Sequence, residues 1–158
     1  MKTSIGIGDM APVFDLPTNS NGRTKLQDYR GKNLLLYFYP KDDTSGCTKQ
    51  AIAFTEHLQA FADLNTVILG VSKDSPASHD KFIAKHSLGI MLASDESLET
   101  CQAYGVWVEK NMYGRKYMGV ERSTFLIGAD GKILQAWRKV RVAKHIENVL
   151  EALRISVS

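Results

Sequence analysis

Two short, mostly apolar runs, each bounded by turn-forming residues, mark the centre of the predicted fold. Residues 33–39 and 66–72 have the pattern of strands that are buried on both faces. Between them, five residues recur at spacings of four, three, four and three: Cys47, Ala51, Phe54, Leu58 and Phe61. This spacing predicts an amphipathic helix with one apolar face. A strand, a helix and a second strand in this order indicate parallel strands joined by a crossover.

Hairpins are predicted on both sides of this unit. The dipeptides Asn21-Gly22 and Asp130-Gly131 favour tight turns between antiparallel strands. They connect segments with strand character: residues 12–16 with 23–27, and residues 119–127 with 132–139.

The remaining segments alternate between helix and strand. In order, they are a helix over residues 76–86 capped by Ser75, a short strand over 88–92, a brief helix capped by Ser94 or Asp95 and ended by Gly105, and a closing helix over 141–156. Parallel and antiparallel strands together predict an α/β fold, in which a mixed central sheet is flanked by helices and preceded by an N-terminal hairpin.

Length and charge narrow the possible classes of protein. The chain has 158 residues without a repeat or linker, so we expect a single domain over residues 1–158. The formal charge of +3 is small and no block of basic residues occurs, which argues against a nucleic-acid partner. No apolar run approaches the ~20 residues that cross a bilayer, and the first residues lack the apolar core of a signal peptide. We expect a cytoplasmic protein without a membrane partner.

The two cysteines, Cys47 and Cys101, are too few and too far apart for a disulfide framework or a Cys-x-x-Cys metal site. No cysteine or carboxylate cluster surrounds the histidines, which lie at polar or boundary positions of predicted helices. We expect four surface histidines, namely His57, His79, His86 and His145. The sequence predicts no metal, haem, flavin or other cofactor.

Cys47 is the leading candidate for a nucleophile. Pro40 ends the first buried strand, a polar loop follows, and the helix begins near Thr44 or Ser45. Cys47 therefore lies in the first helical turn, where backbone N–H groups and the helix dipole stabilise a thiolate. Its position on the apolar face predicts that the thiol points into a pocket rather than to solvent.

The residues around Cys47 also carry a family resemblance. Pro40-Lys41-Asp42-Asp43-Thr44-Ser45-Gly46-Cys47 resembles the Pro-x-x-x-Thr-x-x-Cys motif of peroxiredoxins, which are thiol peroxidases with a thioredoxin-like fold. Three further runs resemble the peroxiredoxin Q branch, also called bacterioferritin comigratory protein: Tyr104-Gly105-Val106-Trp107, Met112-Tyr113-Gly114 and Glu121-Arg122-Ser123-Thr124-Phe125-Leu126-Ile127. The resemblance spans essentially the whole chain.

The resemblance implies a catalytic role for four residues. Cys47 would attack the peroxide as a thiolate and become a sulfenic acid. Arg122 would supply the nearby cation, the Thr44 hydroxyl would bond the thiolate or the peroxide, and Pro40 would shape the pocket wall. Each residue also has a structural alternative: a buried filler for Cys47, a helix cap for Thr44, a surface charge for Arg122 and a strand terminator for Pro40.

The role of Cys101 stays open at this point. In the resembling branch, a second, resolving cysteine commonly lies at the position of Ile52 or near that of Ile83, and neither holds a cysteine here. Cys101 lies between Leu98 and Tyr104 at a core-facing spacing, which favours a small buried side chain. A resolving role would require local unfolding at the start of the Cys47 helix. The enzyme would be of the one-cysteine type or an atypical two-cysteine type.

The leading interpretation is a thiol-dependent peroxidase for hydrogen peroxide and organic hydroperoxides. The resemblance implies that thioredoxin, a glutaredoxin or another external thiol regenerates Cys47, and that the protein is a monomer. A peroxide-sensing redox signalling protein on the same scaffold is one alternative. A thiol–disulfide oxidoreductase is another, although Cys47 has no cysteine three residues away with which to form a redox pair.

Overall fold

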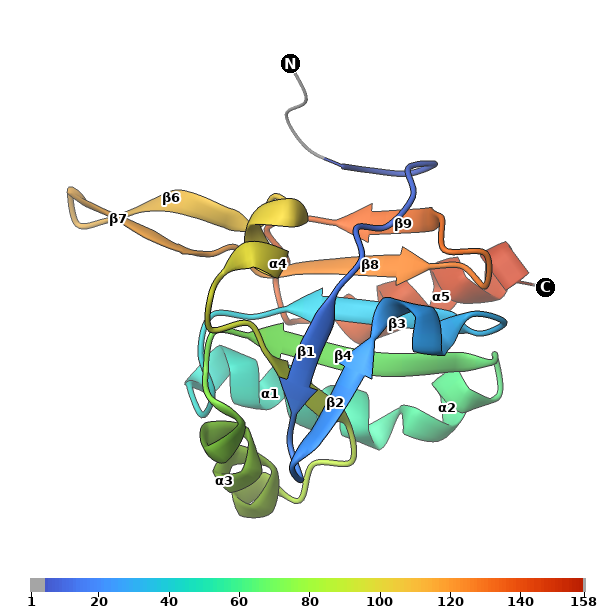
Figure 1. Cartoon of the computed structure of the whole chain (residues 1–158), viewed down its shortest axis with the longest axis horizontal. Coiled ribbons are helices and arrows are strands. Elements are labelled where there is room, and N and C mark those ends of the chain that lie inside the picture. Colours follow the sequence, from blue (N-terminus) through green and yellow to red (C-terminus); the bar gives the residue numbers. More distant parts are fainter. Residues whose placement is uncertain (1–4, 158) are drawn as a thin grey trace.

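A seven-stranded mixed sheet forms the centre of the molecule (Figure 1). The structure is a computed structural model, and it describes residues 5–157. The spatial order of the sheet is β2-β1-β5-β4-β3-β8-β9, and β6 and β7 form a separate two-stranded hairpin. The strands are β1 (Asp15–Thr18), β2 (Gly22–Lys25), β3 (Asn33–Phe38), β4 (Thr66–Ser72), β5 (Met91–Ser94), β6 (Trp107–Met112), β7 (Arg115–Val120), β8 (Ser123–Ile127) and β9 (Ile133–Trp137).

The pairing within the sheet follows the predicted pattern. β3, β4 and β5 are parallel, whereas β8 and β9 add antiparallel partners on the other side of β3. The helices are η1 (Leu26–Tyr29), α1 (Ser45–Glu56), α2 (Leu58–Ala62), α3 (Pro76–His86), α4 (Glu99–Ala103) and α5 (His145–Val157). None of the helices within residues 5–157 is long and apolar enough to span a lipid bilayer.

The central strand β3 separates two apolar layers. All six of its residues are buried, and alternate side chains point to opposite faces, as the pleat of a strand requires. Leu34, Leu36 and Phe38 pack in the layer that is covered by α4 and the N-terminal segment. Leu35 and Tyr37 pack in the layer covered by α1, α2, α3 and α5, which contribute large residues such as Phe54 and Phe61.

Several boundaries differ from the predicted ones. At the N-terminal hairpin, Ser20 and Asn21 adopt positive φ, and Gly22 is already the first residue of β2. A Cβ on Gly22 would lie 2.7 Å from Oγ1 of Thr18, so a larger residue would clash. The predicted helix after β3 is interrupted at His57, β5 lies a few residues later than expected, and the closing helix begins at His145 rather than Arg141.

The hairpin of β6 and β7, here called the arm, was not predicted. It extends away from the sheet (Figure 1), and its tip is a turn in which Tyr113 and Gly114 both have positive φ. The predicted strand over residues 119–127 is in fact two strands, β7 and β8, which are separated by Glu121 and Arg122. Most arm residues are at least partly exposed, so neither strand shows the apolar alternation by which half-buried strands are recognised.

Candidate active site

Cys47 lies where the central strand gives way to helix α1. β3 ends at Phe38, Pro40 follows, and Thr44 has the extended backbone of an N-cap residue before α1. The backbone N–H of Thr48 donates to the carbonyl of Thr44 at 2.8 Å, which closes the first helical turn around Cys47. Cys47 is 2% exposed and packs in the layer of Phe54 and Phe61, as its position on the apolar face of the helix predicted.

Arg122 reaches Cys47 from the start of β8, the strand that pairs with β3. Ser123 pairs with Phe38 in the antiparallel register of β8 and β3, so the preceding residue lies beside the end of β3. Nη2 of Arg122 donates to Sγ of Cys47 at 3.2 Å, and Nη1 donates to Oε1 of the fully buried Gln50 at 2.5 Å. The two terminal nitrogens of the guanidinium therefore contact residues in the first two turns of α1.

Gly46 makes room for this guanidinium. A Cβ at position 46 would lie 3.2 Å from Nη2 of Arg122, so the guanidinium would have to shift by a few tenths of an ångström. Gln50, which accepts the hydrogen bond from Nη1 of Arg122, was not predicted as a site residue. Its one sequence signal is its spacing, because a residue three positions after Cys47 shares the same face of a helix.

In the described part of the chain, the Thr44 hydroxyl forms no hydrogen bond with the sulfur of Cys47. The hydroxyl of Thr44 donates to the carbonyl of Lys41 at 2.9 Å and so closes the loop that precedes α1. Thr44 is exposed, and Pro40 is half-buried two residues after the end of β3. Bonding of the Thr44 hydroxyl to the thiolate or to a peroxide stays a prediction, as does the shielding role of Pro40.

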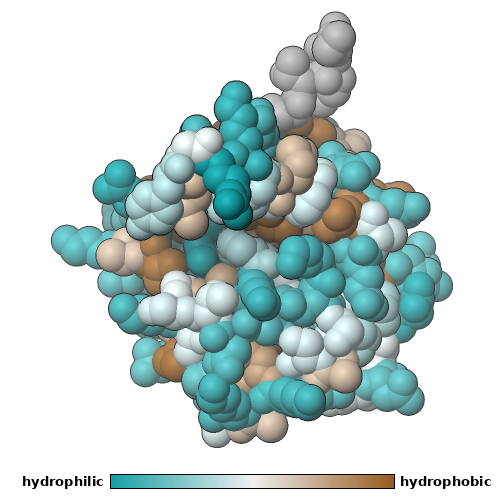
Figure 2. Space-filling view, turned by 90° about the vertical axis from the view of Figure 1, so that its left-hand side faces the viewer, coloured by the Kyte–Doolittle hydropathy of each residue, from teal (hydrophilic) through white to brown (hydrophobic). Residues whose placement is uncertain are grey.

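A cleft of about 440 Å³ opens beside Arg122 at the base of the arm. Its lining includes Lys110, Tyr117 and Lys139, so cations outnumber carboxylates around it. Burial and the positive charge of Arg122 lower the pKa of Lys110. The face toward which the arm projects is mostly hydrophilic with small apolar areas between (Figure 2). A larger cavity of about 600 Å³ lies elsewhere, between the N-terminal hairpin and α4.

Cys101 lies on the opposite face of the sheet from Cys47. It is fully buried with Leu36 and Phe38, the β3 residues that point away from the Cys47 layer. The carboxylate of Asp95 accepts hydrogen bonds from the backbone N–H of Cys101 and from its thiol. Burial, followed by this hydrogen bond and the charge of Asp95, raises the pKa of the Cys101 thiol.

The expectation of four surface histidines is wrong for two of them. His79 is fully buried, and His145 is 4% exposed. His145 lies at the start of α5, with its ring against Phe54 and Trp137 and its Nε2 2.9 Å from Oγ1 of Thr124. Burial, and to a lesser degree the charge of Arg122, lowers the pKa of His145 to about 4. Residues 5–157 contain no group of three or more His, Cys, Asp or Glu suited to a metal ion.

Known proteins resemble this chain over most of its length. The model of the AhpC/TSA family matches residues 7–136. Peroxiredoxin Bcp of Bacillus subtilis is 44% identical over 151 residues, which cover 96% of this chain and 96% of that protein. The chain belongs to the peroxiredoxins.

Solved peroxiredoxin Q structures have the same fold. One from Xanthomonas campestris has a TM-score of 0.88 and 44% identity and covers 92% of both chains. A mutant of the Xylella fastidiosa protein has a TM-score of 0.94 and 39% identity and covers 99% of this chain and 100% of that one. These similarities confirm the predicted family and thioredoxin-like fold. As a peroxiredoxin, the chain is a thiol-dependent peroxidase, with a peroxide as substrate and a thiol as reductant.

Proposed function

We propose that Cys47 is the peroxidatic cysteine and that it reduces hydrogen peroxide and small organic hydroperoxides. The observation that carries this proposal is the 3.2 Å contact from Nη2 of Arg122 to Sγ of Cys47. A guanidinium stays charged and presents several donors in a fixed fork, so it can stabilise a thiolate and bind a peroxide oxygen together. The inclusion of organic substrates is supported by the 43% identical Xanthomonas campestris bacterioferritin comigratory protein, whose structure concerns alkyl peroxide reduction.

The reaction at Cys47 follows from the placement of these donors. The thiolate attacks the terminal oxygen of the hydroperoxide, the O–O bond breaks, and its electron pair leaves on the other oxygen. That oxygen takes a proton and departs as water or an alcohol, while Cys47 becomes a sulfenic acid. Arg122 and the N–H groups of the first helical turn stabilise the charge that develops on the leaving oxygen. In this proposal the Thr44 hydroxyl orients the peroxide, and Pro40 keeps water from the sulfur.

An external thiol then resets Cys47 in a one-cysteine cycle. The thiol condenses with the sulfenic acid and releases water, and a second thiol breaks the resulting mixed disulfide. Thioredoxin or a glutaredoxin would supply this dithiol chemistry. The placement of Cys101 supports an external reductant, because the sheet separates it from Cys47 and its thiol is held by Asp95.

The mass of the intact protein after one equivalent of hydrogen peroxide tests both steps. We expect a gain of one oxygen, carried by Cys47 and captured by dimedone as an adduct. A loss of two hydrogens would reveal an internal disulfide and would contradict a one-cysteine cycle. An unchanged mass at Cys47, with oxidation found elsewhere, would contradict its role as the nucleophile.

We further propose that the chain acts in the cytoplasm as a monomer with a single domain. Both cysteines are free thiols, which suits a reducing compartment. The monomeric state is carried over from the resembling branch. Light scattering across a range of concentrations tests it, and a mass that doubles in the reduced protein would contradict it.

A further inference from the structure

The loop that carries the site, residues 39–44, contains two consecutive aspartates that both face helix α3. Asp43 pairs with Lys85 and His86 near the end of α3, but its side chain is 41% exposed. Such surface ion pairs contribute little to stability. Asp42, in contrast, has a side chain only 4% exposed and points into the protein toward His79. The buried aspartate is therefore the contact that can fix the loop.

The carboxylate of Asp42 is surrounded by donors. The hydroxyl of Tyr39 donates to Oδ1 at 2.5 Å, and the hydroxyl of Ser78 donates to Oδ2 at 2.8 Å. Nδ1 of His79 lies 2.7 Å from Oδ2. The backbone N–H of Asp42 donates to the carboxylate of Asp74, which follows the end of β4. Main chain and side chain of this one residue are thus both held from outside the loop.

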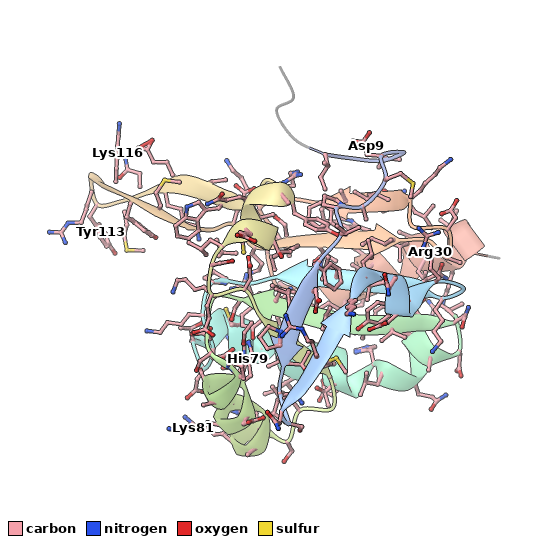
Figure 3. The ribbon with its side chains drawn as sticks, in the orientation of Figure 1. Asp9, Arg30, His79, Lys81, Tyr113 and Lys116 are labelled. Carbon is pink, nitrogen blue, oxygen red and sulfur yellow. The ribbon has the colours of Figure 1, made fainter. Side chains whose placement is uncertain are left out.

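His79 lies on the inner side of α3, whereas Lys81 on the same helix projects away from the protein (Figure 3). The second ring nitrogen, Nε2, is 3.0 Å from the carbonyl oxygen of Ala93 in β5. A carbonyl oxygen can only accept, so Nε2 carries a hydrogen. Nδ1 contacts the carboxylate of Asp42, so the ring of His79 joins the loop to β5. This buried histidine–aspartate pair was not predicted from the sequence.

This pair lies close to Cys47 along the chain. It is bonded to the β4–β5 side of β3, whereas Arg122 directly precedes β8 on the other side of β3. Asp42 is three residues before the first residue of α1, and the Thr44–Lys41 hydrogen bond makes the intervening loop compact. The start of α1 is therefore held on one side by Arg122 and on the other by the pair. We propose that Asp42 and His79 are positioning residues that hold Cys47 in its buried, peroxide-reactive place beside Arg122. This inference rests on the proposed role of Cys47.

Two reactions of Cys47 have opposite requirements and can test the proposal. Attack on peroxide needs the sulfur held beside Arg122, whereas alkylation by iodoacetamide needs a thiolate and access to a residue that is now 2% exposed. In the full chain carrying His79→Asn, we expect the rate constant for hydrogen peroxide to fall roughly tenfold or more. The rate of iodoacetamide labelling should rise severalfold, with peptide mass spectrometry used to assign both products to Cys47.

Matched variants keep the test decisive. His57→Asn makes the same change at a half-buried histidine that bonds within α1, and we expect both rates to stay as in the wild type. Ser78→Ala removes one donor from Asp42. It should lower the peroxide rate and raise the labelling rate, each by a smaller factor than His79→Asn. If His79→Asn does not fold, the result with Ser78→Ala decides.

The proposal is overturned if both rates of a folded His79→Asn protein stay within twofold of the wild type, or if both fall together. A wild-type protein in which iodoacetamide labels Cys47 but peroxide does not oxidise it would refute the proposed function instead. The labelling rate would then still report whether the pair holds the loop.

Discussion

The two cysteines of this peroxiredoxin lie at nearly the same depth but in opposite electrostatic surroundings. Cys47 is 2% exposed and Cys101 is 0% exposed, each beneath one face of the same sheet. A guanidinium donates to the sulfur of Cys47, whereas a carboxylate accepts from the thiol of Cys101. Burial alone disfavours a thiolate, and a neighbouring cation opposes that effect while an anion adds to it. The charge of the neighbour, rather than depth, distinguishes the two sites.

Removal of each thiol in turn gives the largest expected contrast. We expect Cys47→Ser to abolish peroxide consumption, because the other thiol in the described part of the chain, that of Cys101, lies beside a carboxylate rather than a guanidinium. Cys101→Ser should retain the first oxidation step, since its thiol lies on the opposite face. A peroxide-consumption assay with a thiol reductant checks both variants. Equal loss in the two proteins would erase the distinction drawn between them.

Removal of the cation from the Cys47 side comes next in size. Arg122→Met should lower the second-order rate constant with hydrogen peroxide about 10²–10³-fold, which is typical for the loss of one preorganised donor. Arg122→Lys should recover part of this rate, because it restores the charge without the fork that bridges Cys47 and Gln50. Stopped-flow oxidation measures these rates. The exposed Arg141→Met serves as a control, and a similar loss in that variant would argue against a specific role for Arg122.

The pH dependence of stability tests the surroundings of His145, whose pKa is lowered by burial and by the charge of Arg122. The folded protein holds the pKa of His145 at about 4, below its ordinary value of 6.5, so the unfolded chain binds the proton more readily between these values. The contribution is fully present above pH 6.5 and is lost as pH falls toward 4. We expect His145→Gln to remove roughly 2–3 kcal/mol of this acid-dependent loss.

Urea unfolding of the wild type and of His145→Gln at several pH values measures the difference between their free energies of unfolding. Because both proteins contain the same carboxylates, the pH dependence that these groups contribute is absent from that difference. Parallel stability curves for the two proteins would show that His145 is not held neutral by the fold.

Neutralisation of the anion on the Cys101 side has the smallest expected effect. Asp95→Asn weakens the hydrogen bonds from the backbone N–H groups of Thr100 and Cys101, and it should lower the free energy of unfolding by about 1 kcal/mol. The peroxidase rate should not change. Urea unfolding measures the loss, with the exposed Glu96→Gln as a control of equal charge change. A fall in peroxidase rate would link Cys101 to the reaction after all.

Sequence reasoning located Cys47 from local patterns alone. A strand end, a proline and the apolar face of one helix all lie within about two dozen residues, so short-range periodicity was enough. Arg122 had no such local signal. Its contact with Cys47 spans 75 positions along the chain and depends on the register of β8 against β3, so only the family resemblance pointed to it.

The buried histidines and the arm escaped prediction for a different physical reason. A buried polar residue is stabilised by partners from distant segments, as Asp42 and Ala93 stabilise His79, and these partners leave no periodic trace. The arm has no buried face from Glu109 to Met118, so hydrophobic alternation could not reveal its strands. Its turn, Tyr113-Gly114, also lacks the Asn-Gly or Asp-Gly signature of the commonest hairpins.

The pairing of β3 with β8 has a consequence during synthesis. The segment with Cys47 leaves the ribosome well before Arg122, and the two meet only once β8 has emerged and paired with β3. A nascent chain therefore carries Cys47 without the guanidinium that, in the proposed function, makes it reactive toward peroxide. On that proposal, the order in which the chain is made delays oxidation of Cys47 until the fold that can use it is complete.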